Sequence, residues 1–245
     1  HPLTQALARL TLRRELEKAM FDGALTDQEP PYREHSWLIK KASTHPPRNP
    51  RATATSFSGW VFDLSHAPRS DRQQTLERGK SAEQRIREQR RLARTIGRDY
   101  PSGNDLEVIF EDPLDGSVTP LQATALTVGG RPLQCIPDRV LRNNKTHEVF
   151  VFEHKTTSFN IPAQGWPNLK VQLWCYSWID RWLSAPEVYL IGAIWTPKDG
   201  QWVQSQVVPR WRRSDRAFCA ECMELFGLFG GAASIPNKLQ RGGAR

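Results

Sequence analysis

Long apolar runs are missing from this chain of 245 residues. A helix that crosses a membrane needs about 18 consecutive apolar residues, and the longest candidates, Val188–Trp195 and Leu225–Ser234, are much shorter. The N-terminal segment 1–20 carries Arg or Glu every few positions and has no apolar block like that of a secretory signal peptide. We therefore expect a soluble, intracellular (cytoplasmic) protein with no membrane partner.

Cysteine is also scarce, since the whole chain contains four. That number is too small for a disulfide framework and favours reduced thiols. Cys219 and Cys222 have the spacing of half a metal site, which two chains would have to complete together. We expect them instead to pack as small hydrophobic side chains on one helix.

Acidic residues are outnumbered by basic ones, 26 to 34, so the net charge is +8 and the isoelectric point is near 9.6. An excess of this size attracts polyanions, of which nucleic acid is the commonest. The most basic stretch, Asp71–Ile96, has no proline and is rich in helix-forming residues. We expect a helix that faces DNA phosphates here, with a merely solvated face as the alternative.

Alternating apolar residues begin at Leu106 and predict a run of β-strands. Earlier, residues 2–22 have helical spacing, residues 42–59 contain three prolines and indicate a loop, and residues 56–64 indicate a short strand or turn. Later, we expect strands at Leu106–Glu111, Leu121–Val128, Pro132–Val140, Glu148–Glu153, Val188–Trp195 and Trp202–Val208, with helices at Asn168–Leu183 and Ser214–Leu228, the last capped by Ser214. This order predicts an α/β fold with a mixed central sheet flanked by helices. Residues 1–70 would form a helical and loop extension to one compact domain over 71–245.

Two of the predicted neighbouring strands each bring a carboxylate. Asp138 follows Pro137, and Glu153 ends an apolar run. Because side chains two apart on a strand share a face, Lys155 should lie beside Glu153, and Asp138 can join them from the next strand. Two carboxylates suit a Mg²⁺ ion that keeps part of its water shell and lies beside a phosphate. A lysine at such a site can orient or deprotonate a water molecule. In the alternative, Lys155 is only the structural ion-pair partner of Glu153.

This spacing resembles the signature of the PD-(D/E)XK nuclease superfamily. Here the signature consists of Pro137-Asp138, fourteen further residues and Glu153-His154-Lys155. The apolar strand Phe150–Phe152 leads directly into the second half, which suits a site that needs rigid support. The resemblance implies the restriction-endonuclease-like core of that superfamily.

Two further motifs are similar to the RecB-like branch of the superfamily, which includes relatives of the lambda exonuclease. Gln172 and Tyr176 match its Q-x-x-x-Y helix motif. Upstream, Gly79 followed four residues later by Glu83 looks like its first motif, with Glu where many members have His. The motifs occur in the order of that branch over residues 79–176, which is less than half of the chain.

The resemblance implies a DNA nuclease that uses Mg²⁺ or Mn²⁺ and leaves 5′-phosphate ends. The implied metal ligands are Glu83, Asp138, Glu153 and the backbone carbonyl of His154. Lys155 would be the catalytic lysine, and Gln172 and Tyr176, one helical turn apart, would steady the substrate or that lysine. Contacts to DNA would come from Arg78, Lys80, Arg87, Arg90, Arg139, Thr156 and Trp166, with help from Arg210, Arg212, Arg213 and Arg216.

Several interpretations stay open at this point. Some members of the branch bind an iron–sulfur cluster through one upstream and three downstream cysteines, an order that this chain does not have, so we expect no cluster. An exonuclease is the form we favour, with a structure-specific endonuclease or a non-catalytic DNA- or partner-binding module as alternatives. A homo-oligomer or a recombination or repair partner is compatible with each of them.

Overall fold

The structure is a computed structural model that describes residues 35–66, 106–112, 117–158, 160–162, 164–198, 201–205 and 208–235. The helices expected over residues 2–22 and 71–96 therefore lie outside the described residues. Within these ranges, no helix is long and apolar enough to cross a membrane.

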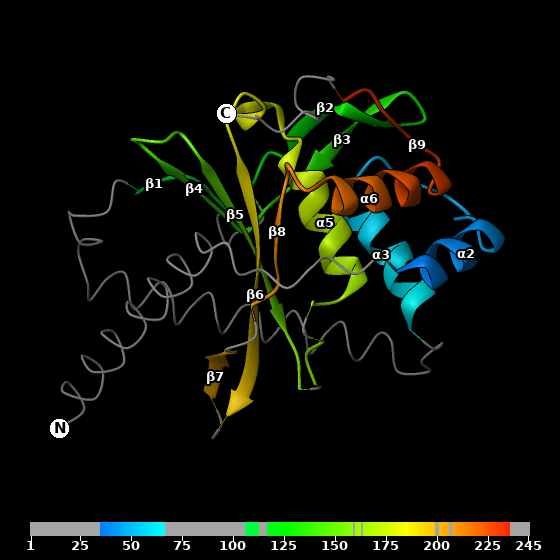
Figure 1. The fold of residues 1–245 in the computed structure, drawn as a ribbon, viewed down its shortest axis with the longest axis horizontal. Helices are drawn as coiled ribbons and strands as arrows, with labels where there is room; N and C mark the ends of the chain where they lie inside the picture. Colours follow the sequence, from blue (N-terminus) through cyan, green and yellow to red (C-terminus); the bar gives the residue numbers. More distant parts are fainter. Residues whose placement is uncertain are drawn as a thin grey trace.

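A mixed β-sheet lies at the centre of the described structure (Figure 1). Strand β4 is antiparallel to both of its neighbours, β1 and β5, whereas β5 and β6 run parallel. Strands β7 and β8 each pair antiparallel with β6. The bounds are β1 Leu106–Glu111, β4 Arg139–Asn143, β5 Val149–Thr156, β6 Val188–Lys198, β7 Gln201–Gln204 and β8 Arg210–Arg212. The predicted α/β fold with a mixed central sheet is confirmed.

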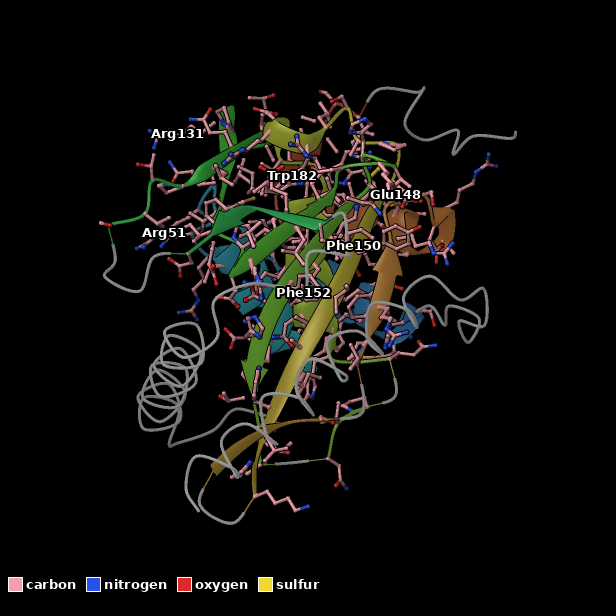
Figure 2. All side chains as sticks on the ribbon, turned by 90° about the vertical axis from the view of Figure 1, so that its left-hand side faces the viewer. Arg51, Arg131, Glu148, Phe150, Phe152 and Trp182 are labelled. Carbon is pink, nitrogen blue, oxygen red and sulfur yellow. The ribbon has the colours of Figure 1, made fainter. Side chains whose placement is uncertain are left out.

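Helices cover one face of this sheet (Figure 1). They are α2 (Ser36–Thr44), α3 (Ala54–Ser65), α5 (Pro167–Ser177) and α6 (Arg216–Leu228). The main hydrophobic core fills the space between the sheet and these helices. Figure 2 looks at the opposite face, where Phe150 and Phe152 belong to a smaller apolar cluster with Leu141, Tyr189 and Ile191.

Helix α5 provides the crossover that two parallel strands need, since it connects β5 to β6. Pro167 occupies its first turn, where the missing N–H is not required. Leu169, Val171, Leu173 and Trp174 are all fully buried, and the polar residues Lys170, Gln172 and Ser177 are buried as well, so the helix is buried on every side. Such a helix must be enclosed by protein, and α5 packs against β5, β6, α3 and α6.

The helix expected over Asn168–Leu183 contains Trp174, Trp178 and Trp182, and all three are buried. However, α5 ends at Ser177, and Trp182 belongs to a separate 3-10 turn, Asp180–Trp182. The main-chain carbonyls at this break accept hydrogen bonds from the buried guanidinium of Arg213, namely those of Ser177, Trp182, Leu183 and Ala185. The expectation that Arg213 contacts DNA phosphate is therefore wrong, because its donors are used inside the protein.

The single strand expected over Pro132–Val140 is also wrong. It divides into β3 (Arg131–Cys135) and β4, which belong to different sheets. Pro137 lies in the break between the two strands and has no N–H to donate to a hydrogen bond with a neighbouring strand. Strand β3 instead joins β2 (Leu121–Val128) and β9 (Gly231–Ala233) in a small antiparallel sheet.

The loop and the short strand or turn expected over 42–64 contain a helix, α3. Thr53 caps it, because its hydroxyl oxygen accepts a hydrogen bond from the N–H of Ser56 at 3.0 Å. Phe57, Val61 and Leu64 recur at helical spacing and are buried in the main core. Tertiary burial of this stripe outweighs the low helix propensity of a segment rich in Ser, Thr and Gly.

The C-terminal elements differ from expectation in two details. The strand expected over Trp202–Val208 is replaced by β7 and β8. Asp215 caps α6 by accepting from the N–H of Phe218 at 3.1 Å, whereas the expected cap, Ser214, hydrogen-bonds to Glu187.

The two cysteines of α6 pack as expected. Cys222 is fully buried in the main core and Cys219 packs partly buried against it. Burial raises the pKa of the Cys222 thiol well above its ordinary value, so the thiol stays neutral there.

Candidate active site

The candidate site lies at the start of β4, where the neighbouring strand β5 extends past it. Arg139, the first residue of β4, pairs with Phe152, so β5 extends beyond β4 by its last four residues. Asp138 stands just before β4 at this open edge. One of its carboxylate oxygens accepts a hydrogen bond from the backbone N–H of His154 at 2.6 Å. The first carboxylate of the motif is thereby held against the strand that carries the second.

The same contact orients the backbone of His154. The N–H and C=O of one strand residue point to the same side of the strand. Because the N–H of His154 meets Asp138, its carbonyl also points to the edge that β4 leaves open. Its side chain lies elsewhere, since the ring Nδ1 accepts a hydrogen bond from the indole N–H of Trp195 at 3.1 Å. A backbone role for His154 is therefore compatible with this geometry.

Glu153 and Lys155 lie on one face of β5, as strand alternation predicts. The Lys155 ammonium donates to Glu153 Oε1 at 2.7 Å. The Glu153 side chain is 6% exposed and that of Lys155 is 26% exposed, so the buried carboxylate holds an amine that still reaches solvent. The same oxygen accepts a second hydrogen bond, from Gln172 Nε2 at 2.7 Å.

Gln172 and Tyr176 face the site together from α5. Gln172 Nε2 also donates to the Tyr176 hydroxyl at 2.7 Å. The hydroxyl in turn donates to the main-chain carbonyl of Ile136 at 2.9 Å, in the segment that leads into Asp138. The predicted pairing at i and i+4 is confirmed, and it connects the two carboxylate-bearing segments through α5.

Burial, followed by the nearby charge of Glu153, raises the pKa of Tyr176 well above the ordinary value of about 10. The unfolded chain therefore loses this proton first as the pH rises. The stability due to the neutral phenol is complete below about pH 10 and should fall by up to about 1.4 kcal/mol per pH unit above it. We expect urea unfolding between pH 9 and 11 to show a steeper loss for the wild type than for Tyr176→Phe. Parallel curves would contradict this.

The remaining residues predicted to contact DNA differ in their burial and in their place in the fold. Arg139 is 6% exposed and offers little surface to a phosphate. Thr156 ends β5 on the face of His154, opposite Lys155, and Trp166 packs partly buried against the main core. Five predicted residues lie outside the described residues: Arg78, Lys80, Glu83, Arg87 and Arg90.

Two neighbours of the site were missed by sequence reasoning. Asp112 follows β1, and its N–H donates to the Asp138 carbonyl at 3.1 Å, so β1 ends beside the first carboxylate. Ser58 of α3 reaches Gln172 with its hydroxyl. A small polar residue on a helix buried among aromatics carries no sequence signal that marks a site.

Within the described ranges, no group of three or more His, Cys, Asp and Glu side chains is arranged to hold a metal ion. The third implied side-chain ligand, Glu83, lies outside those ranges. The donor set that is described consists of two carboxylates and one backbone carbonyl. These are hard oxygen ligands, and Mg²⁺ is often held by only one or two carboxylates together with water and substrate phosphate.

No protein-family model and none of the curated proteins matches this chain. A solved structure titled "Crystal structure of SSO0001" is similar over 79% of this chain and 85% of its own, with 15% sequence identity and a TM-score of 0.33. A likeness at that level supports no statement about fold or function.

Proposed function

We propose that this protein is a metal-dependent DNA nuclease, with an exonuclease as the favoured form. The observation that carries the proposal is the arrangement at the end of β5. A buried carboxylate, Glu153, holds the partly exposed ammonium of Lys155 at 2.7 Å, and Asp138 is fixed on the same strand backbone. Burying a carboxylate is costly unless it is paired, and pairing it with a solvent-reaching lysine suits a reaction at the surface.

A divalent cation, Mg²⁺ or Mn²⁺, would be held by the carboxylates of Asp138 and Glu153 and by the carbonyl of His154. When bound, it would polarise the phosphodiester and lower the pKa of a water molecule. Asp138 has one oxygen engaged by the His154 N–H, which fixes the direction of the carboxylate. These donors fit the preference of such ions for oxygen ligands.

Lys155 would act on the substrate directly. Its ammonium carries three donors, and one meets Glu153 Oε1. Beside a bound phosphodiester, this ammonium would orient the attacking water and stabilise the negative charge that develops on the phosphate oxygens. Gln172 keeps Glu153 in place from the helix side, so that the carboxylate does not follow the lysine when the lysine moves towards the substrate.

DNA as the substrate is supported by the excess of basic residues over the whole chain. Contacts of lysine and arginine with phosphates hold a duplex or a single strand without selecting a sequence. Products with 5′-phosphate and 3′-hydroxyl ends follow from the family resemblance of the motif.

The test is an assay on end-labelled linear DNA and on closed circular DNA with Mg²⁺ or Mn²⁺. We expect metal-dependent cleavage that EDTA abolishes and that spares the circle. The variant Asp138→Asn retains a hydrogen-bond acceptor for the His154 N–H but loses the charge, so its rate should fall by about 10²-fold or more.

Asp63→Asn is the matched control, because Asp63 is exposed on α3 and its change should leave cleavage intact. Cleavage of the circle would favour the endonuclease. Binding of DNA by folded, metal-supplied protein without any cleavage would contradict the proposal and favour a binding module.

A further inference from the structure

A buried hydroxyl connects helix α3 to the candidate site. Ser58 is 6% exposed and stands on the side of α3 that packs against α5. Its hydroxyl donates to the carbonyl of Asn168 at 2.9 Å and to Gln172 Oε1 at 3.3 Å. One proton is thus shared between a main-chain acceptor and a side-chain acceptor of the same helix.

The direction of the Gln172 amide follows from its partners. An ionised carboxylate only accepts hydrogen bonds, so the group that meets Glu153 must be the NH₂ end of the amide. The oxygen end then faces α3, where the Ser58 hydroxyl donates to it. Both amide protons are used, one by Glu153 and one by the Tyr176 hydroxyl. Glu153, Tyr176 and Ser58 are therefore all consistent with the same orientation of the Gln172 amide.

A continuous chain of hydrogen bonds results. It runs from Ser58 to Gln172, branches there to Glu153 and to Tyr176, and ends on the carbonyl of Ile136. The chain joins α3, α5, β5 and the segment before β4. A buried polar network favours one geometry where rotating a member would leave a buried group without its partner, as rotating the Gln172 amide would here.

We propose that Ser58 is a positioning residue of the nuclease site. Together with Glu153 and Tyr176 it fixes the orientation of Gln172, and Gln172 holds the carboxylate of Glu153 beside Lys155. The proposal deepens the proposed function and rests on it. It also assigns a role to α3, which lies in the segment that the sequence suggested was only an extension of the domain.

The first variant is Ser58→Ala, which removes the hydroxyl and leaves a smaller apolar side chain. The oxygen end of the Gln172 amide then loses the hydrogen-bond donor that holds it from α3. We expect kcat for DNA cleavage to fall by between about twofold and tenfold, the equivalent of one neutral hydrogen bond, with KM for DNA unchanged. The matched control is Ser65→Ala on the same helix, whose hydroxyl bonds only to its own surroundings, namely the carbonyls of Val61 and Phe62 and the ring Nδ1 of the adjacent His66.

A double-variant cycle separates positioning from simple loss of stability. In a Gln172→Met background the amide is gone, so Ser58→Ala should reduce kcat no further. Two effects that multiply would mean that Ser58 acts independently of Gln172, and would overturn the proposal. A wild-type rate in folded Ser58→Ala would overturn it as well.

A second readout does not depend on cleavage. The side-chain amide signals of Gln172, assigned by their absence from Gln172→Met, should shift in the ¹H–¹⁵N spectrum of Ser58→Ala and stay in place in Ser65→Ala. If the wild type cleaves no DNA while these signals shift, the nuclease assignment fails and the positioning of Gln172 by Ser58 stands. If the wild type cleaves DNA and the signals do not move, the positioning role fails alone.

Discussion

Replacing Lys155 with alanine should lower the rate of DNA cleavage by about 10²–10³-fold. The ammonium lies 2.7 Å from Glu153 Oε1 and is the part of the ion pair that reaches solvent. Alanine removes both the donors that would orient the attacking water and the positive charge that would face the phosphate. Glu153 keeps its hydrogen bond from Gln172, so the buried carboxylate is still held. The measurement is single-turnover cleavage of labelled linear DNA.

The control is Lys145→Ala, which removes the same charge from an exposed turn between β4 and β5. Its rate should equal that of the wild type. Lys155→Ala leaves the buried Glu153 carboxylate without its ion-pair partner, so it should unfold at a lower urea concentration than Lys145→Ala, and cleavage is compared where both variants are folded. Normal cleavage by folded Lys155→Ala would mean that the lysine is only the ion-pair partner of Glu153. That result would also remove the main support for the nuclease assignment.

The largest expected effect on stability comes from a different buried pair. Lys170 of α5 and Glu221 of α6 are each 1% exposed, and their side chains form an ion pair. The second oxygen of Glu221 accepts a hydrogen bond from the N–H of His35 at 3.2 Å, just before α2. Removing one partner of such a pair leaves a buried charge uncompensated. Glu221→Gln should therefore lower the free energy of unfolding by about 3–5 kcal/mol.

Urea unfolding followed by tryptophan fluorescence measures this change, because the chain contains nine tryptophans. Glu224→Gln on the exposed side of α6 is the matched control and should change stability little. The double variant Lys170→Met, Glu221→Leu removes both charges and should be more stable than Glu221→Gln alone. If the double variant were no more stable than Glu221→Gln, an unpaired buried charge would not be the cause of the lost stability.

Much of the candidate site was accessible from the order of residues along the chain. The face shared by Glu153 and Lys155 follows from the two-residue period of a strand. The contact between Gln172 and Tyr176 follows from helix geometry, in which residues four apart are neighbours on one face. Each depends on atoms that are close along the chain, so local geometry is enough to predict it.

Other features depended on contacts between distant segments. Helix α3 forms because Phe57, Val61 and Leu64 are buried in the main core, although its composition suggested a loop, strand or turn. The stretch Pro132–Val140 has the pattern of one strand, but its two halves pair in different sheets. The alternation of apolar and polar residues along a strand does not indicate which sheet the strand will join.

The sequence alone therefore established the fold class, the carboxylates with their lysine, and the face on which Glu153 and Lys155 lie. Tertiary structure decided that Asp138 meets the backbone of His154, that Arg213 caps main-chain carbonyls, and that Ser58 reaches Gln172. The reason is physical. Alternation and helical spacing act over a few residues, whereas a hydrogen bond between residues 58 and 172 exists only after two helices have packed together.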